Sequence, residues 1–121
     1  MDVHELQDHC LAKPGAWPDN PWDHEHPVIK VADGAHARIF AFLGADSVGV
    51  KAGHGREVAD AWLERHPGAA RVMAYLGRSG WNDLDLSGEI PDDELLDAVD
   101  ESYRLGVEKL PRKHRPPGWE G

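Results

Sequence analysis

The sequence has a single cysteine and no long apolar run. Cys10 is the only cysteine among 121 residues, which excludes an internal disulfide and a zinc site built from several cysteines. Its position predicts a small buried side chain on a helix. The longest apolar stretches, such as residues 39–43, are far shorter than the roughly 18 residues of a membrane-spanning helix. Residues 1–10 also lack a basic segment followed by an apolar one, so we expect a cytoplasmic protein with no membrane association.

Positive charge is scarce. Thirteen Lys and Arg residues stand against 22 Asp and Glu residues, which gives a formal net charge of −9. Affinity for nucleic acids comes largely from counterions that Lys and Arg displace, so this net charge disfavours binding to a polyanion. The hydrophobic share of 40% is ordinary for a globular domain. We expect one domain over residues 1–121, with residues 110–121 as a basic, proline-containing tail.

Motifs of the common enzyme classes are missing. The chain contains no G-x-S-x-G turn, no Walker loop and no Gly-rich dinucleotide fingerprint. His9 adjoins Cys10, but neighbours on a helix point about 100° apart, so His9 is poorly placed to activate the thiol. We therefore expect a protein that is not an enzyme, with no catalytic residues and no cofactor.

Two segments raise the question of a metal site. His24 and His26 share one face if their segment is extended, and with Asp23 or Glu25 they form a loose ligand set for a transition metal. Residues 81–103 hold nine carboxylates and no Lys or Arg. A hard cation needs several oxygens converging at about 2.3–2.6 Å. These carboxylates instead fall on a strand's outer face, at a helix start and along a helix surface. We therefore expect no specific metal site, either there or at His24 and His26.

Periodicity and turn residues predict an α+β fold that begins and ends with a helix. Helices are predicted over residues 2–13, 56–66 and 92–110, and strands over residues 28–32, 36–43, 46–52, 71–76 and 81–87. Residues 14–27 contain four prolines and are predicted to be an irregular surface segment, which Trp17 and Trp22 anchor to the core. The short connections favour a mainly antiparallel sheet of about five strands.

Four short segments occur in a fixed order along the chain: CLAKPGA, NPW, WNDLDLSGEIPDDELL and SYRLGVEKLP. Together they resemble the MmcQ/YjbR family of small bacterial proteins, over about residues 6–111. The resemblance implies a CyaY-like, frataxin-like two-layer fold with helices packed on one face of the sheet. It also implies an accessory role in binding DNA or another nucleic acid. Arg38 keeps the charge of a lysine common in relatives, whereas Arg78, Ser79 and Gly80 replace a basic residue and histidine ahead of Trp81.

The predicted sheet places two kinds of candidate binding residue. In the strand over residues 81–87, Leu84 and Leu86 must face the core, which puts Trp81 on the opposite face with Lys51. An indole with cationic neighbours is a stacking platform for a base or another planar ligand. In the alternative, the proline-rich segment covers Trp81. The candidate ligand-binding or nucleic-acid-binding residues are Arg38, Lys51, Arg78 and Trp81 near the sheet, and Arg112, Lys113 and Arg115 in the tail.

Two functional classes stay open. In the first, the cations bind nucleic acid, with Lys109 and the tail contacting phosphates. Alternatively, the basic tail is only a solvated chain end without a binding role. In the second, a non-enzymatic module binds a planar small molecule or a protein partner through the open sheet face around Trp81.

Overall fold

The computed structural model describes residues 1–121 as a six-stranded antiparallel sheet with helices packed on one face. The strands, in the sheet order β1-β2-β3-β4-β6-β5, are β1 (Ala16–Asp19), β2 (Val28–Val31), β3 (Arg38–Leu43), β4 (Ser47–Lys51), β6 (Trp81–Asp85) and β5 (Ala70–Val72). The helices are α1 (Val3–Leu11), α2 (Arg56–Arg65) and α3 (Asp92–Glu108). Three short 3₁₀ turns are η1 (Gly34–His36), η2 (Gly77–Ser79) and η3 (Arg112–His114). The predicted α+β fold is confirmed, with one strand more than expected.

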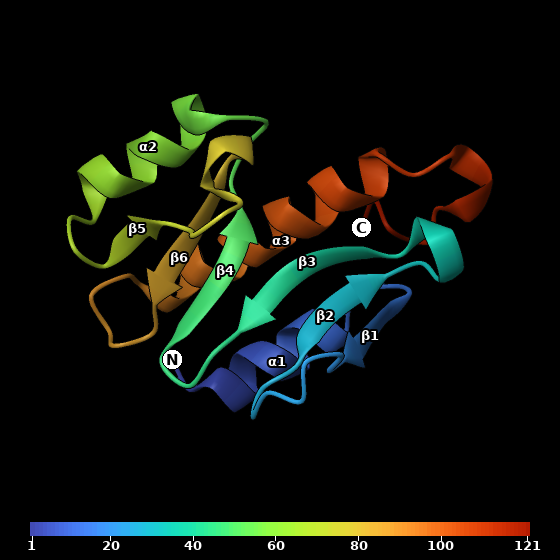
Figure 1. The fold of residues 1–121 in the computed structure, drawn as a ribbon, viewed down its shortest axis with the longest axis horizontal. Coiled ribbons are helices and arrows are strands. Elements are labelled where there is room, and N and C mark those ends of the chain that lie inside the picture. Colours follow the sequence, from blue (N-terminus) through green and yellow to red (C-terminus); the bar gives the residue numbers. More distant parts are fainter.

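The core lies between the sheet and the helices. Figure 1 shows α1 and α3 side by side behind the sheet, with α2 near β5. Alternate residues of the central strands point into this layer, among them Val48, Val50 and Leu84, and all three are buried. α3 contributes a buried stripe at helical spacing, which includes Leu95 and Val99. None of the helices is both long enough and apolar enough to cross a bilayer.

The acidic segment has a structural explanation. Asp92, Asp93 and Glu94 occupy the first turn of α3, as expected, where the helix dipole favours negative charge. Asp85 lies in β6 and pairs with Arg71 at 2.7 Å. Residues 1–121 contain no group of three or more His, Cys, Asp and Glu side chains arranged to hold a metal ion.

Cys10 lies inside the core, as its position in the sequence predicts. Its side chain is fully buried on α1. Burial raises the pKa of the Cys10 thiol to about 12, because the thiolate would lose its hydration. The thiol is therefore protonated at neutral pH and serves as a packing group.

Two segments differ from the predicted elements. Residues 16–19, predicted to be irregular, form β1 at the sheet edge. Proline is tolerated in an edge strand, because such a strand has a neighbour on one side only. Trp17 anchors this strand, since its Nε1 donates to the Ala32 carbonyl at 2.8 Å. The strand predicted over residues 71–76 ends at Val72, and the chain turns away at Tyr75, whose φ of 65° is unusual for a bulky residue.

Ser102 separates two central strands. β3 and β4 pair only through Phe42 with Gly49 and Leu43 with Val48. Beyond these pairs, the buried Ser102 hydroxyl of α3 donates to the Phe40 carbonyl at 2.7 Å and accepts from the Lys51 amide at 3.0 Å. One side chain therefore completes the hydrogen bonds that a continued ladder would otherwise make, and the sheet opens at this end.

This bridge predicts the effect of removing the hydroxyl. Ser102→Ala leaves a buried carbonyl and a buried amide without partners, which we expect to lower the free energy of unfolding by about 1–3 kcal/mol. Urea denaturation followed by circular dichroism measures this loss. The matched control is Ser87→Ala, because Ser87 is exposed and makes no side-chain hydrogen bond; equal stability of the two variants would contradict the bridging role.

Candidate functional site

The opening between β3 and β4 carries a hollow of about 370 Å³ on the sheet face opposite α1 and α3. We call that face the free face and this cavity the basic hollow. Three cations from three elements line it: Arg38 from β3, Lys51 from β4 and Lys109 at the end of α3. Phe42 and Trp81 supply aromatic walls. Arg38, Lys51 and Trp81, which the sequence singled out, therefore meet at one site.

Trp81 and Lys51 are cross-strand partners, but neither is exposed. The indole retains 9% of its accessible surface and Lys51 retains 7%. The Phe42 ring packs edge-on against Trp81 with 5.4 Å between ring centroids. The Lys51 Nζ donates to the Ser79 carbonyl at 2.5 Å. The exposed stacking platform predicted from the sequence is therefore wrong, because Trp81 is buried and the Phe42 ring packs against it.

Burial shapes the electrostatics of the basic hollow. Desolvation lowers the pKa of Lys51, and the nearby Lys109 charge lowers it further. No carboxylate lies within ion-pair distance of either ammonium group. A bound anion would relieve both effects by restoring an opposite charge beside Lys51.

The cations divide into a paired and an unpaired set. Six of the 13 Lys and Arg side chains lie within 4.0 Å of a carboxylate: Lys13, Lys30, Arg56, Arg65, Arg71 and Arg104. The remaining seven are Arg38, Lys51, Arg78, Lys109, Arg112, Lys113 and Arg115. All six cations predicted as binding residues belong to this unpaired set. Their role in binding stays a prediction.

Most of the unpaired cations lie at one end of the molecule, namely Arg38, Lys109 and those of the tail. Figure 1 shows the start of β3 and the carboxyl-terminal segment together at that end. The rings of His36 and His114 stack with centroids 3.9 Å apart, which places η3, with Arg112 and Lys113, beside η1. Arg78 is exposed on η2, next to Ser79 of the basic hollow. The site therefore extends from the hollow onto the tail.

The tail is folded back on the domain. The Arg115 guanidinium donates to the carbonyls of Leu110 and Glu108 at 3.0 and 2.9 Å, which satisfies backbone groups at the end of α3. It also lies 5.5 Å from the Trp119 ring centroid. Arg115 thus holds the tail in place, while Arg112 and Lys113 remain exposed.

A second hollow continues the site along the free face. We call it the aromatic groove; it has a volume of about 580 Å³ and is lined by Trp22, His24, His26, Val28, Phe42, Leu43 and Tyr75. Phe42 lines both cavities, so they adjoin at this ring. Trp22, predicted to anchor its segment to the core, is instead 54% exposed, and Tyr75 is fully exposed.

Sequence reasoning missed the aromatic groove for a physical reason. Tyr75 reaches the groove only because the chain leaves the sheet after Val72, and Trp22 reaches it because β1 directs the following loop across the free face. The sequence shows the two aromatic residues, but their exposure depends on neighbours that are distant along the chain.

Comparisons with known proteins give consistent results. The sequence profile of the YjbR family matches residues 11–105. The uncharacterized protein YjbR of Escherichia coli K12 is 30% identical over 115 residues, which cover 95% of each chain; YjbR of E. coli O157:H7 gives the same values. The crystal structure of Deinococcus radiodurans protein DR2400, with a DUF419 domain, superposes with a TM-score of 0.83. It is 23% identical, covers 94% of this chain and 85% of its own, and supports the fold alone.

Burial of Trp81 predicts a stabilising role for the indole. Trp81→Ala should lower the free energy of unfolding by about 3–5 kcal/mol, because a large buried side chain leaves a cavity. Tyr75→Ala, at a fully exposed aromatic position, should change it by less than about 0.5 kcal/mol. Chemical denaturation of both variants measures the difference. A Trp81→Ala protein as stable as the parent would contradict the buried position.

Proposed function

The chain belongs to the YjbR family, and from this premise we propose that it binds single-stranded nucleic acid across the free face. The observation that carries the proposal is the junction at Phe42, where a hollow lined by unpaired cations meets a groove with two exposed aromatic side chains. A strand of nucleic acid offers both matching chemistries, since phosphates attract cations and unstacked bases pack on aromatic rings.

The cations supply the phosphate contacts. Arg38, Arg78 and Lys109 are exposed and have no carboxylate partner, so binding a phosphate breaks no existing ion pair. Arg112 and Lys113 extend the same positive region along η3. The net charge of −9 matters less than this local arrangement, because fields between exposed charges are screened beyond about 8 Å at physiological salt.

The aromatic groove supplies the base contacts. Trp22 and Tyr75 both expose their rings to solvent, and Phe42 and Val28 form an apolar floor between them. Stacking of a base on an aromatic side chain contributes about 1–3 kcal/mol and tolerates any base. A duplex keeps the faces of its bases stacked on one another, so the groove favours single strands.

A second candidate is a small planar anion, such as a free nucleotide. The basic hollow favours this candidate because its volume of about 370 Å³ lies within the usual range for small-molecule sites. A free nucleotide contacts fewer cations than a strand, so affinity that does not rise with oligonucleotide length would favour the small ligand. A protein partner would use the same face without any requirement for phosphate.

Removing two unpaired cations tests the phosphate contacts. Arg38→Ala combined with Lys109→Ala should weaken binding to a fluorescent single-stranded oligonucleotide, and should reduce the slope of log affinity against log salt by about 1.4, or about 0.7 per lost contact. Fluorescence anisotropy at several salt concentrations measures both quantities.

The control for this test carries the same net charge. Arg65→Ala combined with Arg71→Ala also removes two cations, but both already pair with carboxylates. The control should therefore leave the salt slope almost unchanged. Equal effects of the two double variants, or no binding of the parent protein at about 50 mM salt, would contradict the proposal.

Removing the exposed rings tests the base contacts separately. Trp22→Ala and Tyr75→Ala should each weaken single-strand binding about fivefold or more, the lower end of the stacking range, with the salt slope unchanged. Anisotropy with single-stranded and duplex oligonucleotides of the same sequence provides the comparison. Tighter binding of the duplex, or full affinity without both rings, would show that the aromatic groove plays no part.

A further inference from the structure

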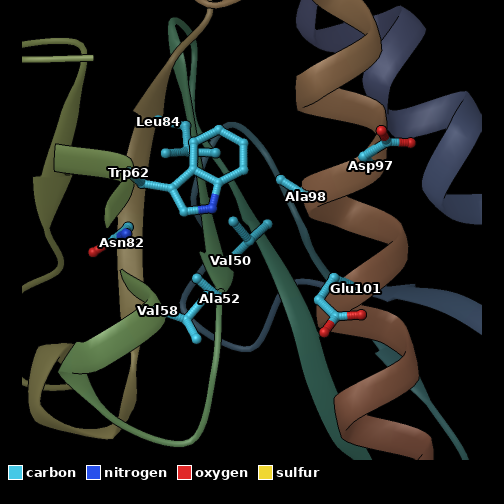
Figure 2. Close-up of a pocket in the computed structure, with 9 residues that line it drawn as sticks. All are labelled: Val50, Ala52, Val58, Trp62, Asn82, Leu84, Asp97, Ala98 and Glu101. Atoms are coloured by element: carbon cyan, nitrogen blue, oxygen red, sulfur yellow. The ribbon is translucent and has the colours of Figure 1, made fainter. Parts of the chain in front are cut away.

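We propose that a separate cleft between α2 and α3 binds a small cationic amine with an apolar, ring-sized body. The cleft has a volume of about 330 Å³ and lies on the helix-covered side of the sheet, away from the basic hollow. Figure 2 shows the Trp62 indole of α2 standing over it, with Ala98 and two carboxylates of α3 on the other side. Nothing in the sequence periodicity predicted this cleft.

The cleft lies where α2 is tied to β6, to η2 and to the start of α3, but not to the rest of α3. At the first turn, the Arg56 guanidinium donates to the carbonyls of Gly77 and Trp81 at 2.9 and 3.1 Å. At the carboxyl end, His66 Nε2 lies 3.0 Å from a Glu94 oxygen at the start of α3. In the middle of α2, the Ala59 carbonyl is bonded to Asn82 of β6, and no hydrogen bond there joins α2 to α3.

The middle of α2 leaves apolar surface exposed. Val58 is 54% exposed and Trp62 is only partly buried, although both belong to the helix face directed at the sheet. Val50, Ala52 and Leu84 form the floor below them. The two helices and the floor therefore leave an apolar space that the protein's own side chains do not fill.

The polar groups of the floor are already satisfied, which selects an apolar ligand body. The Asn82 amide donates to the Ala59 carbonyl at 2.9 Å and accepts from Arg56 at 2.9 Å. The Trp62 Nε1–H group donates no hydrogen bond within the protein, so it is a free donor at the wall of the cleft. A ligand inside the cleft thus meets apolar surface and an indole face, which attracts both rings and cations.

The rim is acidic, which selects a positive charge on the ligand. Asp97 and Glu101 lie one helical turn apart on α3, and Asp97 has no ion-pair partner. The hydrogen bond from Arg104 lowers the pKa of Glu101 below its usual value, so this carboxylate is ionised at neutral pH. Arg65 stacks on Trp62 with its guanidinium 4.6 Å from the ring centroid.

The cations near the rim do not offset Asp97. Arg65 also approaches Glu94 at 3.7 Å, and Arg104 is shared between Glu101 and Glu108. His54 is the remaining titratable group that acts on Glu101. The charge left over at the mouth is therefore negative, and an ammonium group there would approach Asp97 while an attached ring enters the cleft.

Three probes with similar bodies and different charges test the proposal. 2-Phenylethylamine is a cation, 2-phenylethanol is neutral and phenylacetate is an anion at neutral pH. NMR titration of ¹⁵N-labelled protein should shift the indole N–H signal of Trp62, assigned with Trp62→Phe. We expect the amine to bind about two- to fivefold tighter than the alcohol, as a partly exposed ion pair allows, and the acid to bind weakest.

Paired variants separate charge from fit. Asp97→Asn should remove the preference for the amine over the alcohol, while Asp93→Asn, one turn earlier on α3 and outside the cleft, should retain it. Ala52→Leu should fill the floor and abolish binding of both probes, with folding confirmed by an unchanged thermal melt. Equal affinity for amine and acid, an unshifted Trp62 signal, or full binding by Ala52→Leu would overturn the proposal.

Discussion

The Ser102 hydroxyl is the interaction on which the free face depends. It takes the Phe40 carbonyl and the Lys51 amide as partners, so β3 and β4 diverge without leaving buried backbone groups unsatisfied. The divergence gives α3 access to the opposite face of the sheet, where Leu105, Gly106 and Lys109 line the basic hollow. A helix on the core side thereby contributes to a site on the other side.

The paired and unpaired cations lie in different parts of the molecule. For the attraction of anions, this distribution matters more than the net charge of the whole chain. Lys13, which follows α1, and the cations on α2, β2 and β5 are held by neighbouring carboxylates. Those at the end of α3, on η2 and at the start of β3 have none. The body of the protein is acidic, yet one end presents cations that no internal acid neutralises. Local charge of this kind attracts anions even on an acidic protein, because salt screens the distant carboxylates.

The sequence predicted what depends on local periodicity and failed where distant contacts decide. Helix spacing and strand alternation located α1, α2, α3 and the central strands, and the helix dipole accounted for the acids at Asp92 and Asp93. β1 was missed because Pro18 is acceptable only at a sheet edge, and edges are a property of the whole sheet. The burial of Trp81 was missed because Phe42, which packs against it, lies on a strand that is distant along the chain. The candidate cations were chosen from strand alternation and from the basic tail, and their role in binding stays a prediction. The α2–α3 cleft was missed because it depends on side-chain ties between elements that are distant along the chain.

We propose that the opening beside Ser102 brings cations together as an anion-binding surface on the free face. The most direct measurement is a map of amide chemical shifts of the ¹⁵N-labelled protein during titration with a short single-stranded oligonucleotide. We expect the shifts to concentrate in residues 36–42, 76–81 and 109–115, with Tyr75 and Trp22 among the affected signals. Shifts confined to α1 and α2, or spectra that do not change at low salt, would contradict it.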